Sequence, residues 1–229
     1  MKWNLVFFDK VESTNDAAAS LPFKTCVVAK EQTKARGRMG RKWISLTGNL
    51  FFSLVLKNYG MQTPLLSFVL SLSVAECLKE FNATIKWPND VLIDSKKASG
   101  ILLENLGDKV IAGVGINTQQ APFEDVLYPT TSLDGKIKND VLLKNILNSL
   151  DENIHLFETE GFQKIKDKWL TYSKGVGQEI IIRLPNEEIK GEFIGLTDEG
   201  AVQIKTKDLN CRFITAGDVF FLDERKKND

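Results

Sequence analysis

The residue pattern of this chain changes at Gly175 and Gly177, and this change limits the folds that the chain can adopt. After it come only short apolar runs, parted by Pro, Asn, Asp and Gly residues, at 180–182, 192–196, 201–204 and 219–222. Such runs are typical of a small β-barrel. The sequence therefore predicts two domains, 1–175 and 176–229, and the second ends in a polar tail.

Upstream of the change, strand and helix signals are mixed. A short helix is expected after the polar residues 13–16. Longer helices are expected over 63–81, 140–157 and 162–172, and Thr63 is expected to cap the first of these. Strand-like apolar runs lie at 5–8, 25–29 and 49–56, and the turn-broken runs between 84 and 117 suit hairpins of antiparallel sheet.

Charge and composition argue against several classes of protein. The 30 acidic and 30 basic residues cancel, so no global field draws the chain to nucleic acid or to a membrane surface. Cys26, Cys77 and Cys211 are far apart, which favours a reducing, cytoplasmic compartment, and no run approaches the ~18 apolar residues that cross a bilayer. The single His155 lies in an expected helix, where a structural or surface role is favoured over a zinc site or a catalytic triad.

The most informative segment is 30–43, KEQTKARGRMGRKW, with six positive charges and one negative. Gly37 and Gly40 let the backbone approach a ligand, and arginine side chains can fork onto carboxylate or phosphate oxygens. Trp43 could stack on a purine, shield a reactive intermediate or belong to the core. By itself the segment is also compatible with a solvated basic surface or a nucleic-acid patch.

Two neighbouring segments, 86–91 and 96–104, place a carboxylate, a carboxamide and lysines near tight turns. Asp90 could help to position magnesium with nucleotide phosphates, although Pro-Asn-Asp is also an ordinary turn sequence. Lys97, ahead of Gly100, could place a point charge on phosphate oxygens, although it is one of many basic residues.

A further segment, 112–117, brings two glycines beside a strand and ends on Asn117, whose amide can recognise adenine or ribose edges. The complete dinucleotide-binding fingerprint, the phosphate-binding loop signature and the protein-kinase motifs are missing from the sequence. If the chain uses ATP, it does so on another fold.

Taken together, these segments closely resemble biotin protein ligases, the biotin-[acetyl-CoA-carboxylase] ligase family, in order and spacing. The resemblance rests on Ser13-Thr14-Asn15, Gly37 to Trp43, Lys86 to Asp90, Lys97 to Leu102 and Gly113 to Asn117. It implies an α+β fold: a catalytic domain with a mixed sheet and helices, like class II aminoacyl-tRNA synthetases, followed by a small SH3-like β-barrel. Because the first expected strand starts almost at Met1, a monofunctional form without an N-terminal DNA-binding domain is expected, and no DNA or membrane partner.

The resemblance also implies roles for individual residues. The expected catalytic residues are Lys97, Arg38 and Arg36. The expected biotin-binding residues are Ser13, Thr14, Asn15, Gln32, Arg36, Gly37, Arg38, Lys97 and Gly100. The expected ATP-binding residues are Arg38, Arg41, Trp43, Asn89, Asp90, Lys97 and Asn117, with Asp90 also placed to hold Mg²⁺ with ATP.

The activity implied is attack of the biotin carboxylate on the α-phosphate of ATP, which gives biotinyl-5'-AMP, followed by transfer to a lysine of a biotin carboxyl carrier protein domain. Bringing two anions together explains a need for several cations at one point. Ala35 stands where many relatives carry glycine and Met39 where a basic residue is frequent, so altered loop mobility is expected rather than lost activity. A monomer and a homodimer are both compatible with the sequence.

Other functions remain open. A lipoate or related acyl ligase shares the fold and the chemistry, but the arginine-glycine segment and the barrel favour biotin. A non-catalytic biotin sensor would keep the pocket and lose the charges, whereas Arg38, Lys97 and Asp90 are present. A nucleic-acid-binding protein would need binding that falls steeply with salt, and the zero net charge argues against it.

Overall fold

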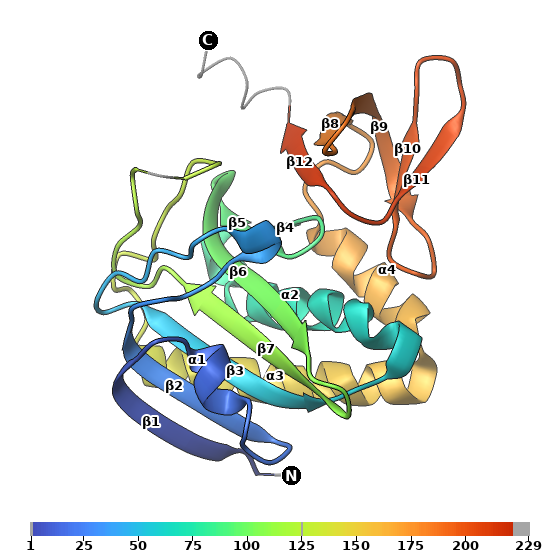
Figure 1. Cartoon of the computed structure of the whole chain (residues 1–229). Coiled ribbons are helices and arrows are strands. Elements are labelled where there is room, and N and C mark those ends of the chain that lie inside the picture. The colour runs from blue at the N-terminus through green and yellow to red at the C-terminus, as the bar shows by residue number, and fades with distance from the viewer. Residues whose placement is uncertain (1, 125, 222–229) are drawn as a thin grey trace.

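A seven-stranded mixed sheet forms the centre of the first domain in the computed structural model, which describes residues 2–124 and 126–221 (Figure 1). The strand order is β1-β2-β3-β7-β6-β5-β4, in which β1 and β2 are parallel and the other neighbours antiparallel. The strands are β1 (Asn4–Val11), β2 (Thr25–Gln32), β3 (Leu50–Lys57), β4 (Thr84–Lys86), β5 (Asp90–Ile93), β6 (Lys96–Asn105) and β7 (Lys109–Ile116). The hairpins expected between 84 and 117 are β4 to β7.

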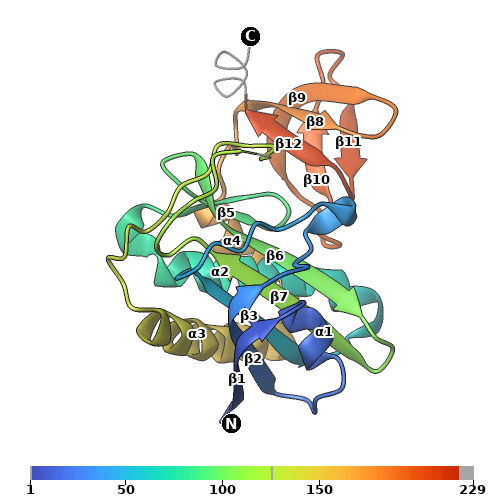
Figure 2. The same cartoon turned by 60° about the vertical axis from the view of Figure 1, so that its left-hand side comes forward.

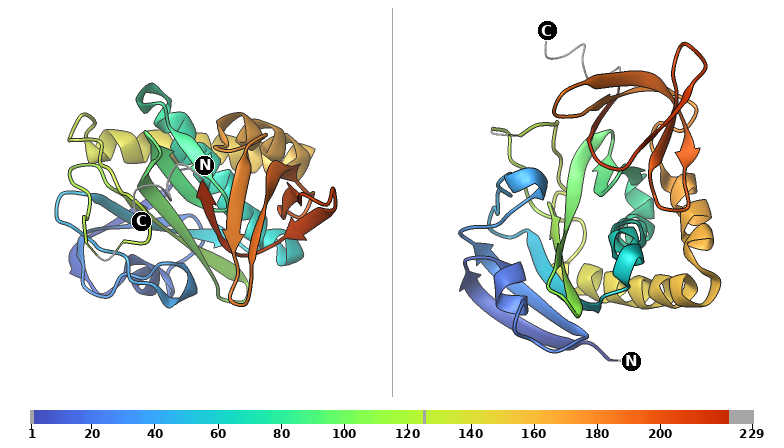
Figure 3. Two further views of the ribbon diagram at one scale, coloured as in Figure 1. Left: turned by 90° about the horizontal axis from the view of Figure 1, so that it is seen from above. Right: turned by 45° about the vertical axis from the view of Figure 1, so that its right-hand side comes forward.

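Helices cover the two faces of this sheet unequally (Figure 3). The helices α2 (Leu66–Cys77), α3 (Asn139–Glu160) and α4 (Phe162–Tyr172) pack against one face and enclose the main hydrophobic core. The short α1 (Thr14–Ala18) lies on the other face over a small apolar cluster, and Ser13 caps it by accepting a hydrogen bond from the amide of Asn15. Most of the second face is therefore not covered by helices, and the candidate site lies there.

Among the described residues, no helix combines the length and the apolar character needed to cross a membrane.

The helix expected over 63–81 is divided into three parts. A 3-10 helix over Gly60–Leu65 leads into α2, and a second one, Lys79–Phe81, follows it. Thr63 does not cap α2, because its hydroxyl accepts from the amide of Tyr59 and donates to Asn58 in the preceding turn. α2 lies between the sheet and the other two helices and is buried nearly all round.

The C-terminal domain is a five-stranded antiparallel sheet, consistent with the expected SH3-like barrel. Its strands are β8 (Glu179–Arg183), β9 (Glu188–Leu196), β10 (Val202–Lys205), β11 (Cys211–Ile214) and β12 (Asp218–Phe221), in the order β11-β10-β9-β8-β12. β11 was not expected, because it is an edge strand with three exposed residues and no apolar alternation. The predicted polar tail, 223–229, lies outside the described residues. The predicted fold class, α+β with a mixed sheet and a C-terminal β-domain, is confirmed.

The two domains are in direct contact. The indole Nε1 of Trp87, in the turn after β4, donates to the carbonyl of Gly200 in the C-terminal domain at 3.0 Å. Segment 35–43 lies between the two sheets (Figure 2).

His155 is exposed on α3, which is the surface placement expected from the sequence.

Candidate active site

A cavity of about 580 Å³ lies on the face of the mixed sheet that carries α1, and both domains contribute to its wall. All of the site residues expected from the sequence line it. These are Ser13, Thr14, Asn15, Gln32, Arg36, Gly37, Arg38, Arg41, Trp43, Asn89, Asp90, Lys97, Gly100 and Asn117. Segments far apart in the chain therefore meet around one space, which is large enough for a small-molecule ligand.

Glycines on β6 and β7 make room for the side chains that enter this space. Gly100 and Gly115 are paired across the two strands, and the Trp43 ring lies on them. A Cβ atom at Gly115 would be only 2.5 Å from the indole ring of Trp43, and one at Gly113 only 2.4 Å from the Oδ1 atom of Asn15. The two glycines noticed in segment 112–117 are thus required by close packing rather than by a turn.

Two buried polar atoms at the cavity lack a partner within the described part of the chain: the Nε1 donor of Trp43 and the Oδ1 acceptor of Asn117. Leaving such groups unsatisfied costs about 1–3 kcal/mol each. A ligand that accepts at one and donates at the other would remove this cost, as a nucleotide base and ribose can.

One end of the cavity concentrates positive charge. The Lys97 ammonium is 2.7 Å from the Asp90 carboxylate and 5.5 Å from the centre of the Trp43 ring. Arg38 donates to the Oδ1 atom of Asn89, whose amide nitrogen donates in turn to the carbonyl of Ile101. Burial lowers the pKa of Arg38, although the carboxylates of Asp90 and Asp218 oppose the shift, and the guanidinium still carries its charge. This end can therefore bind an anion.

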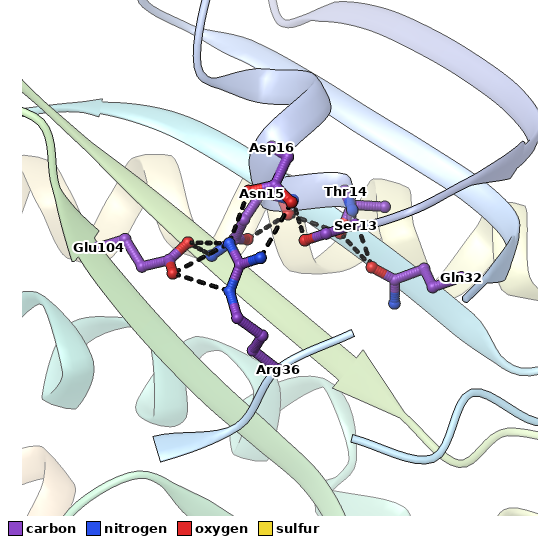
Figure 4. A network of polar contacts seen from close by, with 8 residues as sticks. Ser13, Thr14, Asn15, Asp16, Gln32, Arg36 and Glu104 are labelled. Atoms are coloured by element: carbon purple, nitrogen blue, oxygen red, sulfur yellow. Dashed lines mark hydrogen bonds and ion pairs between the residues drawn. The ribbon is translucent and has the colours of Figure 1, made fainter. Parts of the chain in front are cut away.

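The other end holds a chain of neutral polar groups around α1 (Figure 4). The backbone amide and the hydroxyl of Thr14 both donate to the Oε1 atom of Gln32, at 2.8 and 2.9 Å. The Ser53 hydroxyl lies 2.7 Å from the Thr14 hydroxyl and 2.6 Å from the Oδ1 atom of Asn15. We call Thr14, Asn15, Gln32 and Ser53 the head-group subsite. Ser53 was missed in the sequence, although a polar residue in the middle of an apolar strand was a usable signal.

Arg36 points away from the cationic end. Its guanidinium contacts the Asp16 carboxylate at 2.6 and 2.9 Å and the Glu104 carboxylate at 3.2 Å (Figure 4). The hydrogen bond with Arg36 is the main cause that holds the pKa of Asp16 below its usual value. Neither acidic residue was expected at the site, and only their position beside the motifs could have drawn attention to them.

The C-terminal domain closes the cavity near Arg41. The Arg41 guanidinium donates to Asp218 at 2.9 Å, and its Nε atom donates to the carbonyl of Arg38 at 3.1 Å. Lys86 lies 3.1 Å from the centre of the Tyr128 ring, and burial is the main cause that raises the pKa of that tyrosine. Asp218 and Tyr128 were not expected from the sequence, and Lys86 was noticed only as part of its motif.

The two departures noted in segment 30–43 have different settings. Ala35 is buried, and its carbonyl accepts from the amide of Trp43 at 3.0 Å. Met39 has a left-handed backbone, with φ of 55°, and its side chain is 64% exposed. Most of the Met39 side chain thus faces solvent, and its Sδ atom lies 3.5 Å from the Nη2 atom of Arg41.

Comparisons with known proteins identify the family to which this fold belongs. Residues 8–120 match the Biotin/lipoate A/B protein ligase family and residues 175–222 match the Biotin protein ligase C terminal domain. The two matched regions contain most of the two sheets, so the fold is that of the biotin and lipoate ligase class.

The individual relatives narrow this class. The chain is 35% identical to the bifunctional ligase/repressor BirA of Bacillus subtilis, over 91% of this chain and 71% of that protein. It is 33% identical to a biotin-[acetyl-CoA-carboxylase] ligase of Paracoccus denitrificans, over 93% and 98%. A solved biotin protein ligase from Aquifex aeolicus in complex with biotin and ATP superposes with a TM-score of 0.84 at 34% identity, over 95% of this chain and 97% of that one. The chain belongs to the biotin protein ligase family.

Proposed function

We propose that this chain is an ATP-dependent biotin protein ligase that makes biotinyl-5'-AMP and transfers the biotinyl group to a lysine of a biotin carboxyl carrier protein domain. The observation that carries this proposal is one cavity with Arg38 and Lys97 at one end and the head-group subsite at the other. Relatives of this family have been solved with biotin and ATP and with biotinyl-5-AMP.

The first step joins a carboxylate to a phosphate, and the protein assists mainly by charge. Both reactants are anions, so their approach is opposed unless cations lie between them. Arg38 and Lys97 provide these charges, and Asn89 and Asp90 hold them in place through the contacts described above. Attack of a carboxylate oxygen on the α-phosphorus forms the mixed anhydride and expels pyrophosphate, with no covalent enzyme intermediate.

Magnesium fits this site only together with the nucleotide. Within residues 2–124 and 126–221, no group of three or more His, Cys, Asp or Glu side chains is arranged to hold a metal ion. Asp90 is one carboxylate at the cationic end, and Mg²⁺ is commonly held by one or two carboxylates plus phosphate oxygens and water. Asp90 would therefore hold the ion against the triphosphate, where it would neutralise the phosphate charge.

The ends of the ligand follow from the same arrangement. The ureido ring of biotin has donors and an acceptor, which match the hydroxyl and amide groups of Thr14, Asn15 and Gln32. Trp43 and Asn117 would face the nucleotide with the unsatisfied atoms described above. In the second step, the amine of the carrier lysine attacks the carbonyl carbon of the anhydride. The bond from this carbon to the phosphate oxygen breaks, AMP leaves, and the amine loses a proton as the amide forms.

The experiment that tests the function is exchange of labelled pyrophosphate into ATP with biotin, with lipoate and with neither acid. Exchange that requires biotin supports the proposal, and transfer of biotin to a carrier domain would complete it. Exchange with lipoate alone would replace it with a lipoate ligase. Biotin binding without exchange would leave a sensor.

Placing a methyl group at Gly115 is expected to weaken ATP binding. In Gly115→Ala the new Cβ displaces the Trp43 ring from the floor of the cavity. Loss of the stacking surface should raise the KM for ATP about tenfold, equivalent to about 1.4 kcal/mol. Kinetics of pyrophosphate exchange would measure this. If the packing is the cause, Gly115→Ala combined with Trp43→Ala should be no worse than Trp43→Ala alone; additive effects would contradict it.

Removing the charge of Asp218 should disturb the cationic end from the other domain. In Asp218→Asn the guanidinium of Arg41 loses its ion pair, and the hydrogen bond from Arg41 to the carbonyl of Arg38 becomes less constrained. We expect the KM for ATP to rise about fivefold, which corresponds to ~1 kcal/mol for a partly exposed pair. Asp198→Asn is the matched control, because Asp198 also belongs to the C-terminal domain and pairs with a cation of the first domain, Lys166 on α4, and neither residue lines the cavity. Equal effects of both variants would rule out the specific contact.

A further inference from the structure

Arg36 is neutralised by acidic residues rather than directed at an anion site. Its Nε, Nη1 and Nη2 atoms all donate to Asp16 or Glu104, and within the described residues every hydrogen bond of this side chain ends on one of these carboxylates. Arg38, by contrast, contacts a neutral carboxamide. The net charge around Arg36 is therefore not positive, and this place does not attract a carboxylate or a phosphate.

Its position leads to the same conclusion. Glu104 and Lys97 are both on β6, and the extended strand between them covers roughly 20 Å at about 3.3 Å per residue. The Arg36 guanidinium lies against Glu104, and the anion-binding end lies at Lys97. The two cations consequently occupy different parts of the cavity.

Glu104 connects Arg36 to the head-group subsite. Its Oε2 atom accepts from the Nδ2 atom of Asn15 at 2.5 Å, and its Oε1 atom accepts from Arg36. The Oδ1 atom of Asn15 accepts from the Ser53 hydroxyl, which is also hydrogen-bonded to the Thr14 hydroxyl. The Thr14 hydroxyl donates in turn to Gln32. The same carboxylate thus orients a residue of the ligand pocket and a residue of segment 33–43.

We propose that Asp16 and Glu104 anchor segment 33–43 through Arg36, and that Glu104 is the positioning residue that couples this anchor to the head-group subsite. This inference deepens the proposed function and rests on it. Arg36 acts through its carboxylate partners to keep the segment closed over the ligand, while Arg38 and Lys97 meet the anions. The side chains of Arg36, Asp16 and Glu104 are 41%, 52% and 31% exposed, so the anchor can open to let a ligand enter.

The test uses Glu104→Gln in the full chain. The amide keeps the size and can still bind Asn15, but it loses the charge that holds Arg36. We expect the KM for biotin in pyrophosphate exchange to rise about tenfold, with the KM for ATP within twofold and an unchanged melting temperature. Glu187→Gln is the matched control, because Glu187 makes a comparable two-bond contact with Arg212 far from the cavity. A KM for biotin within twofold of the wild type, or a parallel rise of both KM values with a lower melting temperature, would overturn the proposal.

A second readout does not depend on catalysis. Segment 33–43 contains five sites for trypsin, at Lys34, Arg36, Arg38, Arg41 and Lys42, and Glu104→Gln changes none of them. Trypsin should cut this segment at least fivefold faster in Glu104→Gln and in Asp16→Asn than in the wild type or in Glu187→Gln, without any ligand. Equal cleavage rates would overturn the anchor even if exchange activity proves the ligase. Absence of wild-type exchange with faster cleavage would instead contradict the proposed function and leave the anchor in place.

A double-mutant cycle separates a direct contact from general damage. If Glu104 acts on biotin binding through Arg36, Glu104→Gln with Arg36→Gln should have a KM for biotin no higher than that of the worse single variant. Effects that multiply would show that the two residues act independently, which contradicts the coupling.

Discussion

Replacing Lys97 with alanine should reduce biotin-dependent pyrophosphate exchange by a factor on the order of 10²–10³, the usual loss when a preorganised charge at a reacting oxyanion is removed. Lys97 lies between the Asp90 carboxylate and the Trp43 ring at the cationic end. Without it, the carboxylate and the α-phosphate meet with one cation fewer. The loss should fall mainly on kcat, because the charge is needed most as the two anions approach.

Lys96→Ala is the natural control for this variant. Lys96 is the neighbour of Lys97 on β6, but its exposed side chain points away from the cavity, as the alternation of a strand requires. Lys97→Arg, like Lys97→Ala, should lose exchange activity, since a planar guanidinium does not replace a compact ammonium between a carboxylate and an indole ring. Exchange by Lys97→Ala at more than about a tenth of the wild-type rate would contradict the role assigned to this lysine.

Truncating Trp169 should give the largest loss of stability. This side chain of α4 is fully buried, its ring stands at 64° to that of Phe68 with centroids 5.3 Å apart, and its Nε1 atom donates to Ser71 at 3.0 Å. Trp169→Ala should lower the free energy of unfolding by about 3–5 kcal/mol, because it removes this contact and leaves a cavity among α2, α4 and the sheet.

Denaturant unfolding followed by circular dichroism would measure this change. Trp169→Phe keeps a ring in place and loses the hydrogen bond, so its cost should be about 1–3 kcal/mol. A loss below ~1.5 kcal/mol in Trp169→Ala would mean that α4 contributes little to the core that supports the site.

How well the sequence predicted each element depended on how local its determinants are. The helix at 162–172 appears with the expected bounds, because apolar spacing and the flanking Gly161 are read directly along the chain. The helix expected over 63–81 was divided and buried on all sides, since its environment is set by α3 and by the sheet. The strand β11 was missed because its order comes from pairing with β10 rather than from its own residues.

The candidate site shows the same division. Glycines, arginines and Trp43 follow one another in segment 30–43, so the sequence alone determined that a basic, glycine-containing segment is present and which family it resembles. Asp16 and Glu104 are separated from Arg36 by 20 and 68 positions, and Asp218 from Arg41 by 177. Any of the 30 acidic residues could have paired with these arginines as far as the sequence is concerned.

Only the tertiary structure decided which acidic residues lie beside each cation: Asp16 and Glu104 beside Arg36, Asp90 beside Lys97, and Asp218 beside Arg41. A carboxylate acts over a few ångströms and leaves no periodic pattern in the chain, so its partner is determined by where the strands and helices bring it. The fold brings Ser53 and Asp218 to the site, and it places Arg36 beside Glu104 rather than beside Lys97. The chemical class of the site could be read along the chain, whereas the role of each charge depended on the fold.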